Sequence, residues 1–235
     1  TGNFMSLHTG DEIAKSEKDI FADCIWSKNG HSFYRLRGAC YTAGAAVEWL
    51  KNGIGLIEKP QDTDWICKSV KDTNGVFFVP AFAGLATPFW DQYARGTIVG
   101  ITRGVNKYHI IRATLESIAY QVNDVLEAMK ADSGIELSAL KVDGGASSNN
   151  LLLQMQADIS NAPVNRPICV ETTAMGAAYL AGLAVGYWKS KEDVITNSGI
   201  DRIFEPEIDE QERVQKIKGW NKAVKCAFAW AKDEE

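Results

Sequence analysis

The sequence VDGGASSNN at residues 142–150 constrains the fold of this chain more than any other segment. An apolar segment at residues 140–142 runs into two glycines, and small polar residues then lead into an apolar segment at residues 151–159. Glycine has no Cβ, so it tolerates positive φ and lets a ligand approach the backbone. The N-terminus of a following helix would present N–H groups and a positive dipole end to an anion. The pattern therefore predicts either a strand–turn–helix that cradles a nucleotide or an ordinary tight turn capped by Ser147 or Ser148.

The composition excludes several classes of protein. With 235 residues, 46% of them hydrophobic and 23% charged, the chain is typical of a globular protein with one sizeable core. Its net charge of -5 and pI near 5.3 argue against nucleic-acid binding, which needs a basic face. The five cysteines are odd in number and lack Cys-x-x-Cys spacing, which is typical of reduced thiols in a cytoplasmic protein. The three histidines are isolated in the sequence, so no metal site is expected.

The sequence predicts neither a signal peptide nor a membrane span. No signal peptide is expected before the first strand. The small-residue segment at residues 174–188 is shorter than the roughly 20 apolar residues that a spanning helix needs. Its alanines and glycines favour a helix packed closely against a sheet, and we expect a cytoplasmic protein.

The first third of the chain is predicted to be rich in strands. Residues 20–26 and 31–36 flank an Asn-Gly pair at residues 29–30, which is a strong hairpin signal. Together with a strand at residues 4–9 they predict an antiparallel meander. A helix is expected next over residues 38–50, closed by the Asn-Gly pair that follows it.

The rest of the chain is predicted to alternate between strands and helices. The clearest helix is expected over residues 109–130, where apolar residues recur at helical spacing. This order predicts a single α/β domain, residues 1–235, with a mixed sheet flanked by helices. The remaining predicted elements are strands at residues 76–80, 97–102, 140–142 and 163–166, and helices within residues 59–74, at 151–159, from Thr173 onward and over 210–230.

Several segments resemble one known family. Residues 96–101, followed after seven residues by HIIRATLE, look like the C-terminal signature of the FGGY carbohydrate kinases. The segments PAFAGLATPFWDQYARGTIVGITRGVN, HIIRATLESIAYQVNDVLEAM, VDGGASSNN and TTAMGAAYLAGLAVGYW are similar to those members that phosphorylate glycerol, as is the opening TGNFM. The resemblance extends to about Trp230 and implies a ribonuclease H-like fold of the actin-type ATPase kind.

The resemblance covers the C-terminal half of such kinases. It implies that the enzyme transfers a phosphoryl group from ATP, with Mg²⁺, to glycerol, giving ADP and glycerol 3-phosphate, and that this chain holds the ATP or ADP. The general base, the magnesium carboxylates and most glycerol contacts would lie in the N-terminal half. We therefore expect no catalytic residue and no metal ligand here, no activity from this chain alone, and a homo-oligomer in the full-length enzyme.

The resemblance assigns nucleotide contacts first to the start of the chain. Thr1 and Gly2 correspond to a phosphate-facing turn, or else Thr1 is simply a frayed terminus. Gly44 corresponds to a position beside the nucleotide, with helix–sheet packing as the alternative inside the predicted helix. Glu48 stands where the family often has glutamine; an ionised glutamate can only accept hydrogen bonds, so a solvated helix face is the alternative there.

The resemblance assigns the remaining contacts to the glycine turn and to one aromatic residue. Gly145, supported by Gly144, should let the nucleotide lie against the backbone, and Asn149 should offer its amide to the base. Phe4 corresponds to an aromatic residue that packs on the carbon skeleton of glycerol, with a place in the core as the alternative. Asp143 is interpreted as a structural acceptor for turn N–H groups and not as the base.

Other interpretations remain open. The chain could belong to an FGGY kinase for xylulose, ribulose or gluconate, because most polyol contacts would lie outside it. It could also be a nucleotide-binding module without catalysis. A dinucleotide-binding oxidoreductase is disfavoured, because Gly-x-Gly-x-x-Gly does not follow the first predicted strand. The aromatic segment at residues 82–90 is predicted either to line a cleft or subunit contact, or to pack against the sheet.

Overall fold

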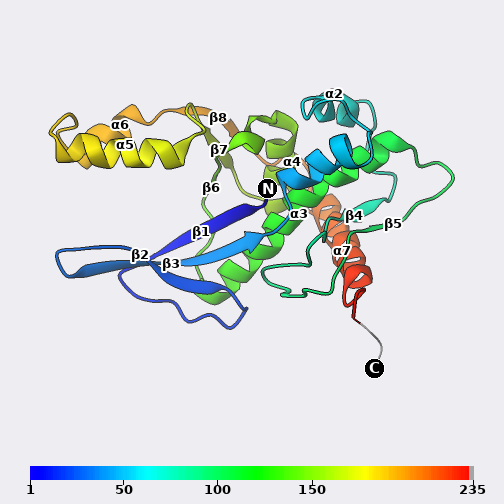
Figure 1. The fold of residues 1–235 in the computed structure, drawn as a ribbon, viewed down its shortest axis with the longest axis horizontal. Coiled ribbons are helices and arrows are strands. Elements are labelled where there is room, and N and C mark those ends of the chain that lie inside the picture. Colours follow the sequence, from blue (N-terminus) through cyan, green and yellow to red (C-terminus); the bar gives the residue numbers. More distant parts are fainter. Residues whose placement is uncertain (233–235) are drawn as a thin grey trace. The chain divides into compact units, whose positions relative to one another are not determined.

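The computed structural model describes residues 1–232, apart from the side chain of Asn197. The chain divides into two compact units. Unit 1 consists of Thr1–Glu136 together with Ile208–Glu235, and unit 2 consists of Leu137–Glu207. Both units combine helices with small sheets (Figure 1).

Unit 1 begins with a three-stranded antiparallel sheet, whose strands lie side by side in Figure 1. The predicted hairpin is confirmed, because Asn29 and Gly30 have φ values of 54° and 80° and so give the left-handed pair that a type I′ turn needs. The predicted meander order is wrong, since the third strand lies between the other two and pairs with both. The strands are β1 (Asn3–Gly10), β2 (Phe21–Lys28) and β3 (His31–Cys40).

The prediction of a helix over residues 38–50 is wrong at its start. Residues 38–40 pair with β1 as the end of β3. A Cβ on Gly38 would overlap Cγ1 of Val125, so this glycine allows β3 to pack closely on the long helix α3 (Lys107–Ser133). The helical segment that follows consists of α1 (Gly44–Glu48) and a π-helical turn, η1 (Trp49–Gly53).

The longest predicted helix is confirmed as α3, which begins two residues earlier than expected. The Asn106 side chain accepts hydrogen bonds from the backbone N–H groups of Tyr108 and His109, and the His109 ring accepts one from the Asn106 N–H. This reciprocal cap satisfies N–H groups that a helix start leaves without partners. Gly134, with φ 66°, ends the helix. The other elements of unit 1 are α2 (Asp62–Lys68), the antiparallel pair β4 (Phe77–Val79) and β5 (Thr97–Val99), and α7 (Glu210–Ala227).

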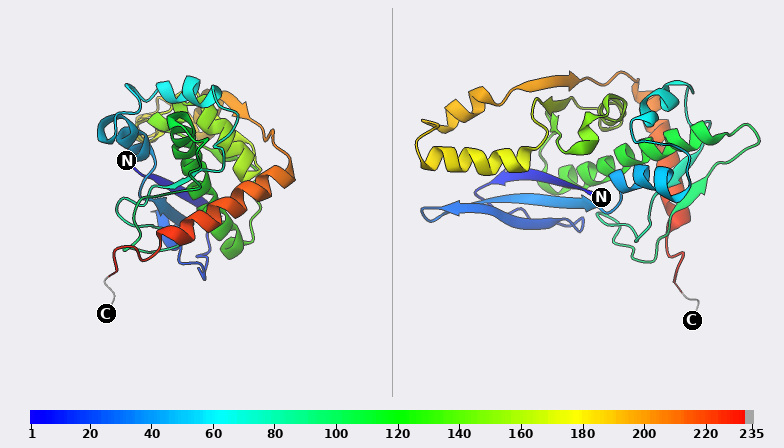
Figure 2. Two further views of the ribbon diagram at one scale, coloured as in Figure 1. Left: turned by 90° about the vertical axis from the view of Figure 1, so that its right-hand side faces the viewer. Right: turned by 45° about the horizontal axis from the view of Figure 1, so that its top comes forward.

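A buried polar network joins three helices of unit 1. The Glu116 side chain is 5% exposed and accepts from Arg112 Nε at 3.0 Å and from the Tyr120 hydroxyl at 2.9 Å. Arg112 also donates to the carbonyl oxygens of Cys67 and Val70 at the end of α2. The α7 residues Lys216, with Nζ 3.7 Å from Glu116, and Trp220, stacked on Tyr120, complete the contact. Figure 2 shows α7 beside α3 in the same unit.

The aromatic segment at residues 82–90 packs within unit 1. The Trp90 ring meets Phe21 of β2 edge to face at 5.3 Å, and Trp90 Nε1 donates to the carbonyl oxygen of Asp19. Phe82 lies 6.0 Å from Phe78 of β4 between ring centroids. Packing against the sheets, one of the two predicted roles, is therefore what the structure shows.

Unit 2 contains the mixed sheet. Its first two strands are parallel and its third is antiparallel to the second. A small core of Leu153, Ala157, Val164 and Phe204 holds one helix against this sheet. The elements are β6 (Leu140–Lys141), the 3₁₀ turn η2 (Gly145–Ser148), α4 (Asn150–Ser160), β7 (Val164–Pro167), α5 (Thr172–Ala184), α6 (Lys191–Asn197) and β8 (Ile200–Phe204).

Two features of unit 2 differ from the sequence predictions. The small-residue helix forms as α5, but none of its residues is buried, so the predicted close packing on a sheet is not seen in the described chain. The strand β8 and the helix α6 were not predicted; the β8 sequence IDRIF neither alternates between apolar and polar residues nor forms a continuous apolar run.

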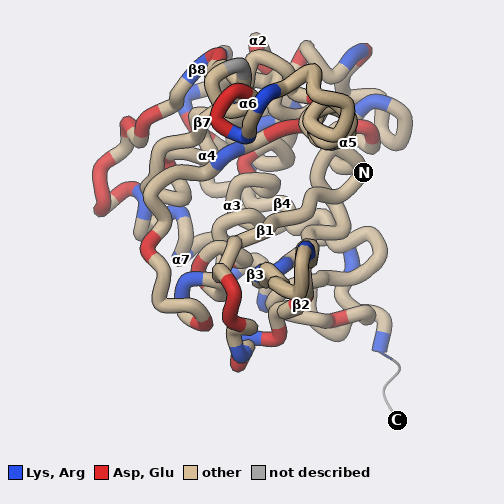
Figure 3. The backbone as a smooth tube through the Cα atoms, turned by 90° about the vertical axis from the view of Figure 1, so that its left-hand side faces the viewer, with Lys and Arg blue, Asp and Glu red and all other residues tan. Residues whose placement is uncertain are grey.

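Within residues 1–232, no helix combines the length and the apolar character needed to cross a membrane. Lys and Arg are dispersed among Asp and Glu along the backbone (Figure 3).

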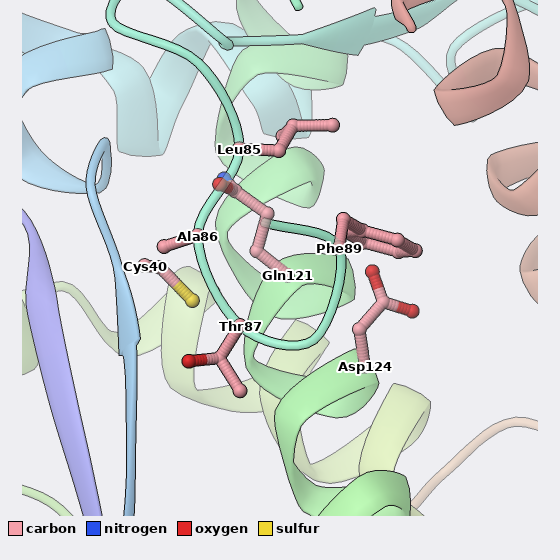
Figure 4. Close-up of a pocket in the computed structure, with 7 residues that line it drawn as sticks. All are labelled: Cys40, Leu85, Ala86, Thr87, Phe89, Gln121 and Asp124. Carbon is pink, nitrogen blue, oxygen red and sulfur yellow. The ribbon is translucent and has the colours of Figure 1, made fainter. Parts of the chain in front are cut away.

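A small pocket in unit 1 contains a carboxyl group whose pKa is raised. Figure 4 shows Asp124 and Gln121 of α3 facing the loop at residues 85–89 and Cys40. Burial raises the pKa of Asp124 to about 7, and the negative charge of Glu127 adds to this effect. The hydrogen bond that Trp220 Nε1 donates to Asp124 Oδ2, at 2.7 Å, acts in the opposite direction.

Replacing Asp124 with asparagine tests this acidity. The ordinary carboxyl pKa is 3.8, so between about pH 4 and pH 7 the folded chain holds a proton that the unfolded chain has lost. The stabilisation from this proton is complete below pH 4 and is lost as the pH rises to about 7. Asp124→Asn keeps an acceptor for Trp220, so its stability relative to wild type should rise by about 4 kcal/mol across that window. Urea unfolding at pH 4, 5.5 and 8 measures this, and a difference independent of pH would contradict it.

Candidate functional site

The first residues of the chain lie against the start of α1 in unit 1. The carbonyl oxygen of Thr1 accepts hydrogen bonds from the backbone N–H groups of Ala43 and Ala45, both at 3.1 Å. A Cβ added to Gly44 would lie 3.8 Å from this oxygen, which is an ordinary van der Waals contact. The structure therefore brings Thr1, Gly2 and Gly44 together.

The two glycines of this group have different local roles. A Cβ on Gly2 would overlap the carbonyl oxygen of Cys40, so the chain can pass the end of β3 only with glycine here. Gly44 is the first residue of α1 and not an interior residue, because the preceding residues belong to β3 and a short turn. The cost of a glycine inside a helix thus does not apply to Gly44, and the helix–sheet packing alternative has no support from its neighbours.

Glu48 and Phe4 are both exposed in unit 1. Glu48 lies at the end of α1, and its carboxylate accepts a hydrogen bond from the side chain of Asn52 in η1. Phe4 lies on β1, pairs with Ala39 and is 76% exposed. The alternative that Phe4 belongs to the core is therefore wrong.

The two glycines of the turn in unit 2 leave open space beside the backbone. Gly144 has φ 78°, and a Cβ added to Gly144 or Gly145 would meet no atom of residues 1–232 within 4 Å. The N–H of Gly144 donates to the carbonyl oxygen of Val170 at 2.8 Å, which fixes the entry into the turn. The backbone of this turn is thus open on the side where a Cβ would lie.

Asparagine, and not serine, caps the helix that follows. Asn149 is the N-cap of α4, and its Oδ1 accepts from the N–H of Leu152 at 3.0 Å. The hydroxyl groups of Ser147 and Ser148 instead donate to the carbonyl oxygens of Gly144 and Gly145, at 2.7 and 2.8 Å. The prediction of a serine cap is wrong, because the 3₁₀ turn η2 separates these serines from α4.

The structure also corrects the role expected of Asp143. This residue is exposed, and its carboxylate accepts no hydrogen bond from the described residues. Its expected function as an acceptor for turn N–H groups is therefore not seen. Within residues 1–232, no cluster of three or more His, Cys, Asp or Glu side chains is placed to hold a metal ion.

Sequence reasoning missed one residue that touches the turn. Arg166 of β7 donates from Nη1 to the carbonyl oxygen of Ser147 and to Oδ1 of Asn150. Its carboxylate partner, Asp201, lies on β8. Because β8 was not predicted, nothing in the sequence indicated that Arg166 and Asp201 would pair beside the turn.

The chain is similar in sequence to known proteins. The model of the FGGY family of carbohydrate kinases, C-terminal domain, matches residues 4–185. The glycerol kinase of Agathobacter rectalis is 62% identical over 234 residues, which are 100% of this chain and 47% of that protein. The glycerol kinase of Carboxydothermus hydrogenoformans is 54% identical over 234 residues, with the same coverage of both proteins. The chain thus spans about half the length of the curated relatives it matches.

Solved structures agree with these matches. Plasmodium falciparum glycerol kinase with ADP superposes with a TM-score of 0.89 and 36% identity, over 96% of this chain and 45% of that one. Gluconate kinase from Lactobacillus acidophilus has the same fold, with a TM-score of 0.80 and 22% identity over 99% of this chain and 46% of that one. The predicted actin-type ATPase fold is confirmed. From the family match over most of its length, the chain belongs to the FGGY family of carbohydrate kinases.

Proposed function

We propose that this chain is the nucleotide-binding half of an enzyme that phosphorylates glycerol with ATP, giving ADP and glycerol 3-phosphate. The observation that carries the proposal is the 62% identity with the Agathobacter rectalis glycerol kinase along the whole chain. Because the chain covers 47% of that relative, the general base, the Mg²⁺ carboxylates and most glycerol contacts are assigned to the other half. This chain alone is therefore proposed to be inactive.

Nucleotide contacts are proposed in each unit separately. In unit 1 they are Thr1, Gly2 and Gly44, where the Thr1 hydroxyl and the adjacent N–H groups would face phosphate. In unit 2 they are the turn at residues 144–145 and Asn149, where the open backbone would lie against the nucleotide. A relative of the same fold whose structure contains ADP supports a nucleotide site in this family.

Two exposed side chains complete the proposed site residues. Glu48 is proposed as a nucleotide neighbour, although its carboxylate is engaged by Asn52 and can only accept hydrogen bonds. Phe4 is proposed to pack on the carbon skeleton of glycerol, and its 76% exposure supports this. Both side chains are exposed, so a ligand can contact them without any rearrangement of the core.

The proposed division of labour follows from the chemistry of phosphoryl transfer. The reaction requires the γ-phosphate to be held in line with the attacking hydroxyl, with its charge neutralised by donors and a metal. Mg²⁺, when bound with ATP, would offset the negative charge of the phosphate groups, and the residues that hold it are assigned to the other half. The residues of this chain would orient the nucleotide, while the other half would present the alcohol and take its proton.

The remaining assignments concern the protein as a whole. We propose residues 1–235 as one family domain; the family model, which matches residues 4–185 and so parts of both units, supports this over that range. By resemblance, the full-length enzyme is proposed to be a cytoplasmic homo-oligomer. A sugar kinase is the second candidate. The gluconate kinase is less similar to this chain than the glycerol kinases are, with 22% identity.

Substrate choice is tested by supplying the missing half. The chain is joined, as one polypeptide, to the N-terminal half of the Agathobacter rectalis glycerol kinase, and ADP release is measured with glycerol, xylulose or gluconate. We expect turnover with glycerol, accompanied by glycerol 3-phosphate. The chain alone and the N-terminal half alone should give only background. A folded fusion that prefers xylulose or gluconate, or has no activity, would contradict the proposal.

A set of glycine variants tests the proposed nucleotide contact in unit 2. Gly145→Ala should change the free energy of unfolding by less than about 0.5 kcal/mol, because the added methyl group enters open space without positive φ. It should nevertheless weaken ADP binding at least fivefold, or about 1 kcal/mol, because the methyl group occupies the proposed ligand space. Denaturant unfolding and an ADP titration followed by NMR measure the two effects.

Two further variants serve as controls for Gly145. Gly144→Ala should destabilise the chain by about 1–2 kcal/mol, because φ 78° is unfavourable for alanine. Gly176→Ala, in α5 and also facing open space, should leave ADP binding unchanged. Equal ADP affinity of wild type and Gly145→Ala would rule out close approach of the nucleotide at this residue.

A further inference from the structure

We propose that Arg166 is a positioning residue for the turn at residues 144–150 and keeps its backbone ready for the nucleotide. This inference rests on the proposed function, because it concerns the same turn. All the residues that carry it belong to unit 2. Arg166 lies on β7, and its side chain is 13% exposed.

One nitrogen of the guanidinium group holds the turn at two points. Arg166 Nη1 lies 3.1 Å from the carbonyl oxygen of Ser147, inside η2. The same nitrogen lies 2.7 Å from Oδ1 of Asn150, the first residue of α4. The arginine thereby ties the 3₁₀ turn and the start of the helix to the strand β7.

The other two nitrogens anchor the arginine to the sheet. Arg166 Nε and Nη2 lie 2.7 and 2.6 Å from Oδ2 of Asp201 on β8. The guanidinium carbon also lies 5.5 Å from the centre of the Phe204 ring. Because all three nitrogens have protein acceptors, Arg166 does not act as a phosphate ligand but acts through the turn that it holds.

Two adjacent asparagines in the turn have different partners. Asn149 caps α4 through the N–H of Leu152, whereas Asn150 binds Arg166. Asn150 is therefore held by Arg166, whose own side chain is fixed to the sheet. Through Asn150, its neighbour in the chain, Arg166 also positions the side chain of Asn149. Holding the turn before the ligand arrives reduces the entropy that binding must overcome.

The contact requires arginine rather than any cation. The guanidinium fork presents donors in two directions at fixed angles, while a lysine ammonium concentrates its donors on one atom. A lysine at position 166 can retain the pairing with Asp201 but cannot reach Ser147 and Asn150 at the same time. Arg166→Lys therefore loosens the turn while preserving the charge.

The test compares Arg166→Lys with a matched control, Arg202→Lys. Arg202 lies opposite Arg166 in the β7–β8 register and 4.6 Å from the centre of the same Phe204 ring. Among the residues that the structure describes, it makes no hydrogen bond to the turn. The control thus changes a cation on the same sheet without touching residues 144–150.

Two readouts on the 235-residue chain separate positioning from stability. Hydrogen exchange without nucleotide is measured at the N–H groups of Ser147 and Asn149, which close the turn, and at Ala157 in the core of α4. ADP affinity is measured by NMR titration. We expect Arg166→Lys to speed exchange in the turn about tenfold with no change at Ala157, and to weaken ADP binding about fivefold. Arg202→Lys should change neither.

The possible failures are distinguishable. Unchanged exchange in the turn of Arg166→Lys would overturn the inference, as would a loosened turn with unchanged ADP affinity. Faster exchange at Ala157 as well would show a general structural role and also overturn it. If wild type itself bound no ADP, the proposed function would fail and the nucleotide role of Arg166 with it, while the exchange data would still show whether Arg166 holds the turn.

Discussion

The buried carboxylate of Glu116 is the constraint on which the packing of unit 1 depends. A buried charge is tolerated only when its partners are close and well oriented. Glu116 obtains them from Arg112 and Tyr120 on its own helix and from Lys216 on α7, while Arg112 also binds the end of α2. Burial and this carboxylate raise the pKa of Tyr120, so its hydroxyl remains a donor. Losing one partner of such a pair typically costs about 3–5 kcal/mol, and here three helices would lose their common contact.

Hydrogen bonds from neighbouring residues also determine the shape of the turn in unit 2, although the backbone of this turn is open on one side. Among the described residues, no atom lies within 4 Å of a Cβ added to Gly144 or Gly145, so these two residues gain nothing from side-chain packing. Its shape instead comes from hydrogen bonds to its neighbours: the Gly144 N–H binds Val170, and Arg166 binds the carbonyl oxygen of Ser147. A turn that is fixed by hydrogen bonds on one side and unobstructed beside its glycines suits a ligand that approaches the backbone. This arrangement links the sequence pattern to the nucleotide-binding role that we propose.

Much of the fold could be predicted from local sequence, and the failures have physical causes. The hairpin and α3 were predictable because their signals are local: an Asn-Gly turn and helical periodicity. The start of the helix at residue 38 was misplaced because Gly38 is needed for packing on Val125, a contact distant in sequence. β8 was missed because its sequence, IDRIF, neither alternates between apolar and polar residues nor forms a continuous apolar run. The candidate site residues came from the family resemblance, whereas Arg166 could not be found without β8, since its partner Asp201 lies there.

The most direct test of the account is an NMR titration of this chain with ADP, following the backbone amides of Gly44, Gly145 and Asn149. Because this chain lacks the contacts that we propose for the other half of the enzyme, we expect a dissociation constant near the millimolar range, equivalent to about 4 kcal/mol. The account predicts saturable shifts at these three residues and none at Gly176 in α5. A folded chain whose amides at Gly44, Gly145 and Asn149 do not shift at several times that concentration, or shift only elsewhere, would contradict it.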